Sequence, residues 1–359
     1  MSLIIDTKIL NELVSKAVKG SSDNKMIPIT SLISIVLKDN VLTLTTTDAM
    51  NILQVFKKDV EGDDFDVVVQ TEMFSRLVMR MTSKTTKLTL KDSSLEVKGN
   101  GTYNIELPLD EDGLPIKFSA QKYEPGKQHE VKLSDIKSIL TANKASLAET
   151  MEVPCLTGYY FNNENVLTTD RYKMCSNNIN VFDDELLLPA ELLDLLLLID
   201  DEEIGVTIYD DKILFESSNV VITGYQLEGV EDYPASAITS YVTQQFQSVC
   251  ELHKDNLLAA LDRFTLFVTP FERNAVILTF TESGLVLDSV NNTATEVVKY
   301  EAVEDFVMFR CVIELELLID QIKAQETEFV EMWFGHEKAL KLVSNKVTQI
   351  VALLEDGNE

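Results

Sequence analysis

Histidine and the motifs that accompany catalysis are scarce in this chain. It has three histidines, His129, His253 and His336, and none has a second ligand at the HExxH spacing of a zinc site. No GxGxxG or GxxxxGK[ST] loop is present to bind a nucleotide, and no GxSxG turn presents a serine nucleophile. These absences disfavour an enzyme, so we expect no catalytic residues, no metal site and no cofactor.

Cysteine pairs and long apolar runs are missing as well. The four cysteines stand far apart without a CxxC pair, which is typical of reduced, buried thiols in an intracellular protein. The N-terminal stretch has no signal-peptide pattern. The most apolar segment, 186–200, is interrupted by Pro189, Glu191 and Asp194 and is too short and too acidic to span a bilayer. We therefore expect a soluble, cytoplasmic protein.

Positive charge is in deficit, with 31 basic against 59 acidic residues and a formal net charge of −28. This balance alone argues against a protein that coats DNA, because phosphate binding needs clustered lysine and arginine. The total does not show where the bases lie, however. An apolar content of 45% over 359 residues predicts a globular protein of two or three domains.

An internal repeat organises the chain. The segment "VLTLTTTDAM" (41–50) is similar to "VLTTDRYKM" (166–174), and the aspartates Asp48 and Asp170 are 122 positions apart. A weaker third copy, "GLVLDSVNN", contains Asp288. Because an apolar alternating strand precedes each Thr-Thr-Asp, the repeated aspartate is interpreted as a strand-end scaffold feature rather than a catalytic group.

Helical patterns recur with the same period. Opening helices are predicted at 6–20, 132–146 and 250–264, the first ending at Gly20 and the second capped near Ser134. Second helices follow short β-like segments within 65–81, 184–199 and 305–322, with Pro189 in a first helical turn. Hairpin turns are expected at Asp92–Ser93 and at Asp210–Lys212.

These patterns predict an α+β fold of three tandem similar domains, each with two helices packed on antiparallel strands. The expected domains are residues 1–121, 122–242 and 243–359, separated by polar segments poor in core residues.

The bases are unevenly distributed and favour the predicted helices. In the helix expected over 71–84, Arg76, Arg80 and Lys84 recur every four residues. A solvated amphipathic face is the simpler interpretation of any one such helix. Basic excess on several helices of an acidic protein favours a surface that faces a polyanion. The candidate residues are Lys8, Lys16, Lys19, Arg76, Arg80, Lys84, Lys132, Lys137, Lys144, Lys254, Arg263 and Lys323.

Two other classes of protein remain open at this point. The many acid pairs, such as Asp63–Asp64 and Asp200–Asp201, could belong to a metal-dependent nuclease, although no pattern brings them to one site. An acidic structural or DNA-mimicking protein that binds basic partners is the second alternative.

The chain resembles the bacterial DNA polymerase III β sliding clamp family, including its phage-encoded members. The most specific part is "PCLTGYYFNNENVLTTDRYKM" (154–174), which is similar to the family's Leu-x-Gly strand and Thr-Asp segment. The segment "LEGVEDYPASAI" (227–238) is similar to the family's Gly-x-Tyr/Phe-Pro segment, and "TQIVALLEDGNE" (348–359) occupies the place of its apolar tail.

The resemblance implies the DNA-clamp fold and a head-to-tail homodimer that forms a six-domain ring around duplex DNA. Helix bases would then face the phosphates without reading sequence. It also implies a groove that binds short apolar peptides of a DNA polymerase and a clamp loader, and no membrane contact. Carried over by position, the groove residues are Leu156, Thr169, Arg171, Tyr172, Lys173, Met174, Pro234, Ile238, Val351 and Leu353.

The chain departs from the family's motif at two places. Arg171-Tyr172-Lys173-Met174 stands where the family has Gly-His-Arg-Leu, and the bulk of Arg171 should reshape the groove. The tail also extends past the family's usual end with "EDGNE". These differences predict a dedicated partner peptide rather than the family's standard one.

Overall fold

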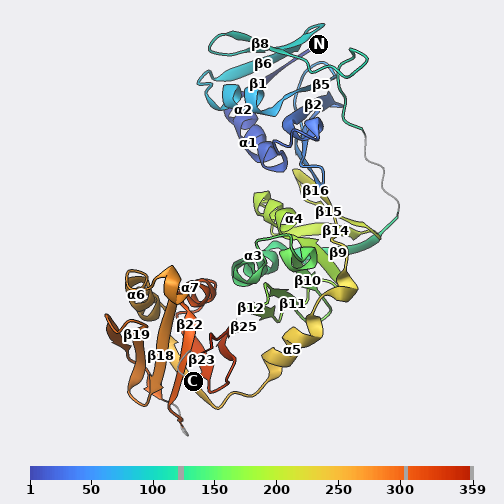
Figure 1. The fold of residues 1–359 in the computed structure, drawn as a ribbon. Helices are drawn as coiled ribbons and strands as arrows, with labels where there is room; N and C mark the ends of the chain where they lie inside the picture. The colour runs from blue at the N-terminus through green and yellow to red at the C-terminus, as the bar shows by residue number, and fades with distance from the viewer. Residues whose placement is uncertain (120–124, 303–305, 356–359) are drawn as a thin grey trace. The chain divides into compact units, whose positions relative to one another are not determined.

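The computed structural model describes residues 1–119, 125–302 and 306–355, and its chain divides into two compact units. The first unit comprises Met1–Leu133 with Glu191–Gln226, and the second comprises Ser134–Ala190 with Leu227–Glu359. Figure 1 traces the chain through both. The central third of the sequence is therefore shared between the two units.

The predicted repeat is present in the order of the elements, strand–helix–four strands–helix–three strands. The first repeat contains β1 (Ser2–Asp6), α1 (Thr7–Ala17), β2 (Leu32–Lys38), β3 (Val41–Thr47), β4 (Asn51–Lys57), β5 (Phe65–Gln70), α2 (Thr71–Met79), β6 (Thr85–Leu90), β7 (Ser94–Lys98) and β8 (Thr102–Glu106). Single 3₁₀ turns follow α1 (Val18–Gly20) and precede β2 (Pro28–Ser31).

The second repeat has the same order. Its elements are β9 (Lys127–Lys132), α3 (Leu133–Asn143), β10 (Gly158–Phe161), β11 (Val166–Thr169), β12 (Lys173–Asn177), β13 (Leu186–Pro189), α4 (Ala190–Leu195), β14 (Glu203–Ile208), β15 (Lys212–Glu216) and β16 (Val220–Tyr225). Its 3₁₀ turns are Lys144–Ser146, Pro154–Thr157, Leu196–Leu198 and Val230–Asp232.

A helix that the sequence patterns did not predict, α5 (Ala235–Thr243), precedes the third repeat. The third repeat contains β17 (Ser248–His253), α6 (Lys254–Phe264), β18 (Ala275–Thr281), β19 (Gly284–Ser289), β20 (Thr295–Val298), β22 (Phe309–Glu314), α7 (Leu315–Lys323), β23 (Phe329–Phe334), β24 (Ala339–Ser344) and β25 (Val347–Ala352). A 3₁₀ turn (Pro270–Glu272) and the short β21 (Glu301–Ala302) complete it.

Antiparallel pairing assembles the described strands into four sheets. The first unit holds the sheets β1-β6-β7-β8 and β5-β2-β3-β4-β16-β15-β14-β9. The second unit holds β13-β10-β11-β12-β25-β24-β23-β17-β21 and β20-β19-β18-β22. The α+β prediction is confirmed. The expected domain boundaries stay a prediction, since residues 120–124 lie outside the described range and the boundary after residue 242 falls inside α5.

The helices share one burial pattern, which explains why their sequences repeat. Helix α1 buries Leu10, Leu13, Val14 and Ala17, and α6 buries Leu257, Ala260, Leu261 and Phe264 at the same spacing. This spacing places an apolar stripe on one helix face. Helix α1 packs beside α2, and α6 packs beside α7 (Figure 1).

Several predicted helix boundaries were wrong, for a common reason. The helices α3 and α6 begin only after a strand that ends at Lys132 and at His253, so Ser134 is not a cap. Helix α2 ends at Met79, which leaves Lys84 in the loop before β6. Pro189 is the last residue of β13 rather than a residue of α4. Short strands paired to distant segments are not visible in local periodicity.

Gly20 does end the first helical segment, but its role is close packing. A Cβ atom at this position would lie 2.5 Å from the Cβ of Leu53 on β4. The glycine therefore allows α1 to approach the sheet, rather than supplying a left-handed helix end.

Candidate functional site

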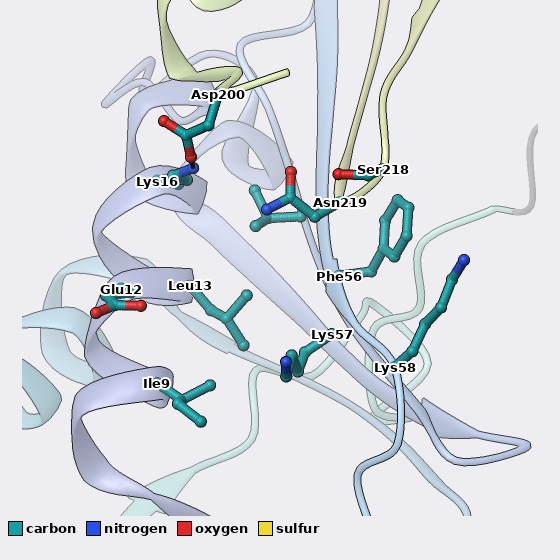
Figure 2. Close-up of a pocket in the computed structure, with 11 residues that line it drawn as sticks. Ile9, Glu12, Leu13, Lys16, Phe56, Lys57, Lys58, Asp200, Ser218 and Asn219 are labelled. Carbon is teal, nitrogen blue, oxygen red and sulfur yellow. Dashed lines mark hydrogen bonds and ion pairs between the residues drawn. The ribbon is translucent and has the colours of Figure 1, made fainter. Parts of the chain in front are cut away.

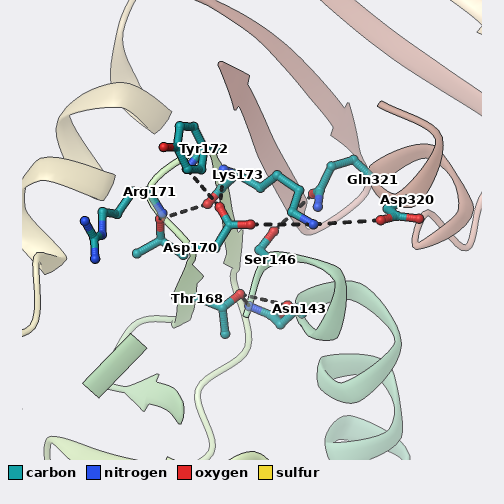
Figure 3. Close-up of polar contacts among 10 residues, drawn as sticks. Asn143, Ser146, Thr168, Asp170, Arg171, Tyr172, Lys173, Asp320 and Gln321 are labelled. Atoms are coloured by element: carbon teal, nitrogen blue, oxygen red, sulfur yellow. Dashed lines mark hydrogen bonds and ion pairs between the residues drawn. The ribbon is translucent and has the colours of Figure 1, made fainter. Parts of the chain in front are cut away.

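The segment Thr169–Lys173 forms a tight turn between β11 and β12 (Figure 3). The Thr169 hydroxyl donates to the Lys173 carbonyl at 2.8 Å and accepts the Arg171 N–H at 3.0 Å. Asp170 Oδ1 accepts the N–H groups of Tyr172 and Lys173 at 2.8 and 2.6 Å. The Asp170 carboxylate, which neighbours Arg171 and Tyr172 in the sequence, therefore stabilises the turn through these hydrogen bonds.

The first repeat contains the same turn. There Thr47 Oγ1 donates to the Asn51 carbonyl at 2.7 Å, and Asp48 Oδ1 accepts the N–H groups of Met50 and Asn51 at 2.9 and 2.6 Å. The prediction that Thr-Thr-Asp is a repeated scaffold is confirmed for these two copies. The third copy differs, because Asp288 lies within β19 and Ser289 makes the turn's hydrogen bonds.

Side chains after Asp170 have sharply different environments. Lys173 is buried, and its Nζ lies 3.6 Å from Asp170 Oδ2 and 3.8 Å from Asp320 Oδ2 (Figure 3). Tyr172 is 65% exposed. Arg171 is exposed and has φ of +83°, a left-handed conformation that favours glycine. A buried, paired lysine thus anchors a turn that presents two side chains to solvent.

An apolar cluster lies against this turn and contains the predicted Leu156 and Ile238. Tyr160 and Tyr233 stack at its centre with ring centroids 4.7 Å apart, and the Tyr233 hydroxyl donates to the Leu167 carbonyl at 3.1 Å. Burial raises the pKa of the Tyr233 phenol. The tyrosine of the "EDYP" segment is therefore a neutral packing group.

Met174 joins this cluster to a second one. It packs against the cluster of Leu156 and Ile238 and also against the cluster of Phe246, Ala339 and Ile350. Pro234 follows Tyr233 in the sequence and directly precedes α5, and its side chain is partly buried. Ile350 was absent from the predicted set and is the tail residue that packs with Met174.

The other predicted tail residues face a different way. Val351 is fully buried in the core of the third repeat, and Leu353 packs against that same core. Because side chains alternate along β25, Ile350 and Val351 lie on opposite faces of the sheet. The part of the tail at 356–359, which extends past the family's usual end, lies outside the described residues.

Four of the ten predicted groove residues line one pocket of about 370 Å³: Leu156, Arg171, Tyr172 and Lys173. The opposite wall comes from the start of α7, with Glu316, Leu317 and Asp320. Thr169 is buried beneath the turn and does not line it. Sequence patterns missed the α7 wall, since nothing local pairs residues near 170 with residues near 317.

The predicted basic surface residues fall into two groups. Four make ion pairs or hydrogen bonds within the chain: Lys16 with Asp200, Arg76 with Glu72, Lys254 with the carbonyls of Lys323 and Gln325, and Arg263 with Glu296. The Arg263–Glu296 pair lowers the pKa of the Glu296 carboxyl by hydrogen bonding. These four are less available to an external anion than the sequence indicates.

The remaining bases are exposed. They are Lys8, Lys19, Arg80, Lys84, Lys132, Lys137, Lys144 and Lys323. Lys144 has a further interaction within the chain. Lys84 lies in the loop before β6, and the others sit on helices or at helix or strand ends. Flexible cations at such exposed positions can reach a polyanion.

A second pocket, of about 460 Å³, lies in the first unit between α1 and the end of β4 (Figure 2). Ile9, Leu13 and Phe56 give it an apolar wall, and Lys16 and Asp200 form an ion pair at one end. Lys57 and Lys58 border it from the β4 side. The mixture of both charge signs gives this pocket no clear ligand preference.

Other features limit the chemistry of the chain. All four cysteines are buried and free, and burial raises the pKa of Cys250 and Cys311 to about 12. Within the described ranges, no three His, Cys, Asp or Glu side chains are grouped to hold a metal ion. None of the described helices combines the length and apolar character needed to cross a bilayer.

Comparisons with known proteins agree with this architecture. Residues 1–115 match the family model described as the N-terminal domain of the DNA polymerase III beta subunit. The beta sliding clamp of Bacillus subtilis strain 168 is 23% identical over 301 residues, 77% of each chain. The beta sliding clamp of Halalkalibacterium halodurans is 24% identical over 312 residues, 80% of each chain.

Solved structures match over nearly the full length. The DNA polymerase sliding clamp from Bacillus subtilis aligns with a TM-score of 0.86 at 19% identity, covering 99% of both chains. The DNA polymerase III beta chain from Streptococcus pneumoniae aligns with a TM-score of 0.88 at 16% identity, covering 99% of this chain and 100% of the other. The fold is therefore that of these proteins, and the family model and the curated relatives show that the chain is similar to bacterial DNA polymerase III beta sliding clamps.

Proposed function

We propose that this chain is a DNA polymerase processivity factor: two copies close head to tail around duplex DNA and hold a polymerase and a clamp loader through short apolar peptides. The chain binds and performs no catalysis of its own. Topology, rather than net charge, retains the DNA, which reconciles a formal charge of −28 with a DNA partner.

The pattern of open sheet edges carries this proposal. Within one chain, β4 of the first repeat pairs with β16 of the second, and β12 of the second pairs with β25 of the third. In both cases the last strand of one repeat's β-meander joins the final strand of the next repeat. The same rule leaves β20 of the third repeat and β8 of the first as sheet edges.

An unpaired edge strand presents a row of free backbone donors and acceptors, which another strand can satisfy. If β20 of one copy pairs with β8 of another copy, a third junction forms in which the last meander strand of one repeat joins the final strand of the next. Such an interface uses different surfaces on the two copies, and it yields a closed ring when the rotation closes. Two chains of three repeats then make a six-repeat ring.

Exposed apolar side chains lie on both edge strands and elsewhere in the same two repeats. Val297 on β20 is 54% exposed, and Leu266, which follows α6, is 81% exposed. Tyr103 on β8 is 41% exposed, and Met73 on α2 is 62% exposed. Exposed apolar side chains on both edge strands support an interface between copies.

The ring interface is tested by molar mass. Light scattering should give twice 40.4 kDa for the wild-type chain. Replacing Leu266 and Phe267 together with Asp should give a monomer, because two charges would be buried in the apolar interface. Met26→Asp changes a side chain that is 91% exposed and belongs to neither edge strand, and should leave the dimer intact. A monomeric wild-type chain would overturn the ring.

The DNA-facing surface is tested by charge removal on exposed bases. The triple variant Arg80→Gln, Lys84→Gln, Lys137→Gln should weaken DNA association and flatten its dependence on salt, with a slope smaller by about 0.9 for each phosphate that is no longer neutralised. The matched variant Lys38→Gln, Lys98→Gln, Lys346→Gln removes as much charge from exposed strand and turn positions. Equal effects of the two variants would contradict a basic DNA-facing surface.

A further inference from the structure

The pocket beside the Thr169–Lys173 turn has an unusual excess of acid. Six carboxylates line it: Glu149, Glu152, Asp170, Glu314, Glu316 and Asp320. They come from three segments far apart in the sequence, namely the loop before β10, the turn itself, and the junction of β22 with α7. Only two cations, Arg171 and Lys173, share the lining.

The internal cation does not balance these acids. Lys173 is shared between Asp170 and Asp320 in Figure 3, and the Asp170 carboxylate also accepts two backbone N–H groups. Across the described part of the chain, no ion pair is found for Glu149, Glu152 or Glu316. Several carboxylates at the pocket are therefore left for an external cation.

The negative charge of these acids affects the pKa of another carboxyl group in the pocket. The pKa of the half-buried Glu314 is raised, first by desolvation and then by the charge of Glu316, with Asp170 adding to it and Lys173 opposing it. An arriving positive charge would relieve this repulsion.

The pocket also has an apolar lining that continues into the predicted groove. Ala148, Val153, Leu156 and Leu317 line it beneath the acids. Leu156 belongs as well to the apolar cluster that contains Ile238. A ligand in this pocket would therefore contact apolar side chains and carboxylates together, which suits an apolar part and a positively charged part within a few residues of each other.

We propose that the partner segment bound in this groove is a basic peptide, with lysine or arginine adjacent to its apolar anchor. This inference rests on the proposed function, because it specifies the peptide of the same groove. Complementary charge of this kind speeds encounter and selects among partners more than it adds raw affinity. Its contribution falls as salt screens the carboxylates.

A divalent cation is the competing ligand for clustered carboxylates. Over the described ranges, no three acids are grouped closely enough to hold one. The carboxylates also share the lining with the cations Arg171 and Lys173. An oxygen cage for a divalent cation needs six or more converging oxygens. A basic side chain with an apolar stem fits such walls better.

Two fluorescein-labelled peptides test the proposal. Both contain the apolar core Leu-Leu-Phe, flanked by three lysines in one and by three glutamates in the other. At low salt the wild-type chain should bind the lysine peptide at least about tenfold more tightly, equivalent to about 1.4 kcal/mol. Salt should narrow the difference.

Two double variants locate the effect. Glu152→Gln with Glu316→Gln should reduce the preference for the lysine peptide to about threefold or less, since both acids line the pocket. Glu164→Gln with Glu282→Gln removes the same charge from two exposed positions outside the pocket and should leave the preference unchanged. Matching results for the two variants would overturn the proposal.

The outcomes distinguish the basic partner peptide from the proposed clamp function. Equal binding of both peptides to the wild-type chain would contradict the basic partner and leave the groove itself supported. Binding of neither peptide would contradict the basic partner as well. Retention on circular DNA would then decide whether the clamp function still stands.

Discussion

The turns Thr47–Asn51 and Thr169–Lys173 share a backbone and differ in what they present. In both, the aspartate accepts two N–H groups, and the third residue has a positive φ, +86° at Ala49 and +83° at Arg171. The first turn carries Ala49 and Met50, whereas the second carries Arg171 and Tyr172 beside an acidic pocket. A repeated scaffold thus separates residues kept for the fold from residues free to acquire a binding role.

The fifth residue of each turn is buried, but the two residues differ in charge. Asn51 is buried, and its amide donates to Asp48 Oδ2 at 2.9 Å. Lys173 is buried as well, but it brings a full positive charge to Asp170 and Asp320. The second turn therefore adds an ionic pair to its carboxylate, whereas the carboxylate of the first turn accepts hydrogen bonds from neutral donors only.

Removing the two aspartates should give the largest effects. Asp48→Ala should destabilise the fold by about 2 kcal/mol because the backbone N–H groups of the turn lose their acceptor. Asp170→Ala should cost about 3 kcal/mol or more, because it also leaves the buried Lys173 with only the more distant Asp320. Urea unfolding of each variant, with each compact unit followed by its own probe, measures the difference. An Asp48 variant that is the less stable of the two would contradict the ionic account of the second turn.

Glycine substitutions at the strained positions should have smaller, matched effects. Ala49→Gly and Arg171→Gly both relieve a left-handed conformation that disfavours side chains, offset by the greater freedom of glycine in the unfolded chain. Each should therefore change stability by about 1 kcal/mol or less, and by similar amounts. Peptide binding should change only for Arg171→Gly, since Ala49 does not belong to the groove. Fluorescence anisotropy with both variants makes that comparison.

The smallest effect concerns pH and the acids beside the second turn. The folded-state pKa of Glu314 lies above its ordinary value, so its favourable contribution to folding is fully present below the ordinary carboxyl pKa and is lost as pH rises through the raised one. Glu314→Gln should therefore be more stable than the wild-type chain at pH 7, and the gap should close as pH falls towards the ordinary glutamate range. Melting temperatures at a series of pH values check this. Glu282→Gln, at an exposed hairpin turn, is the control for removal of one carboxylate.

Much of the scaffold could be predicted from sequence because it is encoded locally. The Thr-Thr-Asp strand ends, the apolar helix stripes and the hairpin turns near Asp92 and Asp210 are short-range patterns, and the structure contains each of them. The third copy of the turn was less accessible. Its loop runs from Ser289 to Thr295, longer than the other two, so the matching aspartate fell inside a strand.

The candidate pocket was less predictable because distant segments build it. Residues near Asp170 meet residues near Leu317 across more than a hundred positions, and no local pattern reports that meeting. The face of β25 that turns towards Met174 depends on strand register, and a shift of one residue exchanges Ile350 for Val351. The sequence patterns did not predict α5, because few of its residues are buried and most of its exposed residues are polar.

Retention on closed DNA tests the central claim most directly. The chain can be threaded onto a linear duplex, the ends joined by a ligase, and free protein removed in about 1 M salt, where charge interactions are screened within about 3 Å. A closed ring should stay on the ligated circle and leave when one cut reopens it. Equal loss from the circle and from the cut DNA would contradict the account that this chain encircles its DNA.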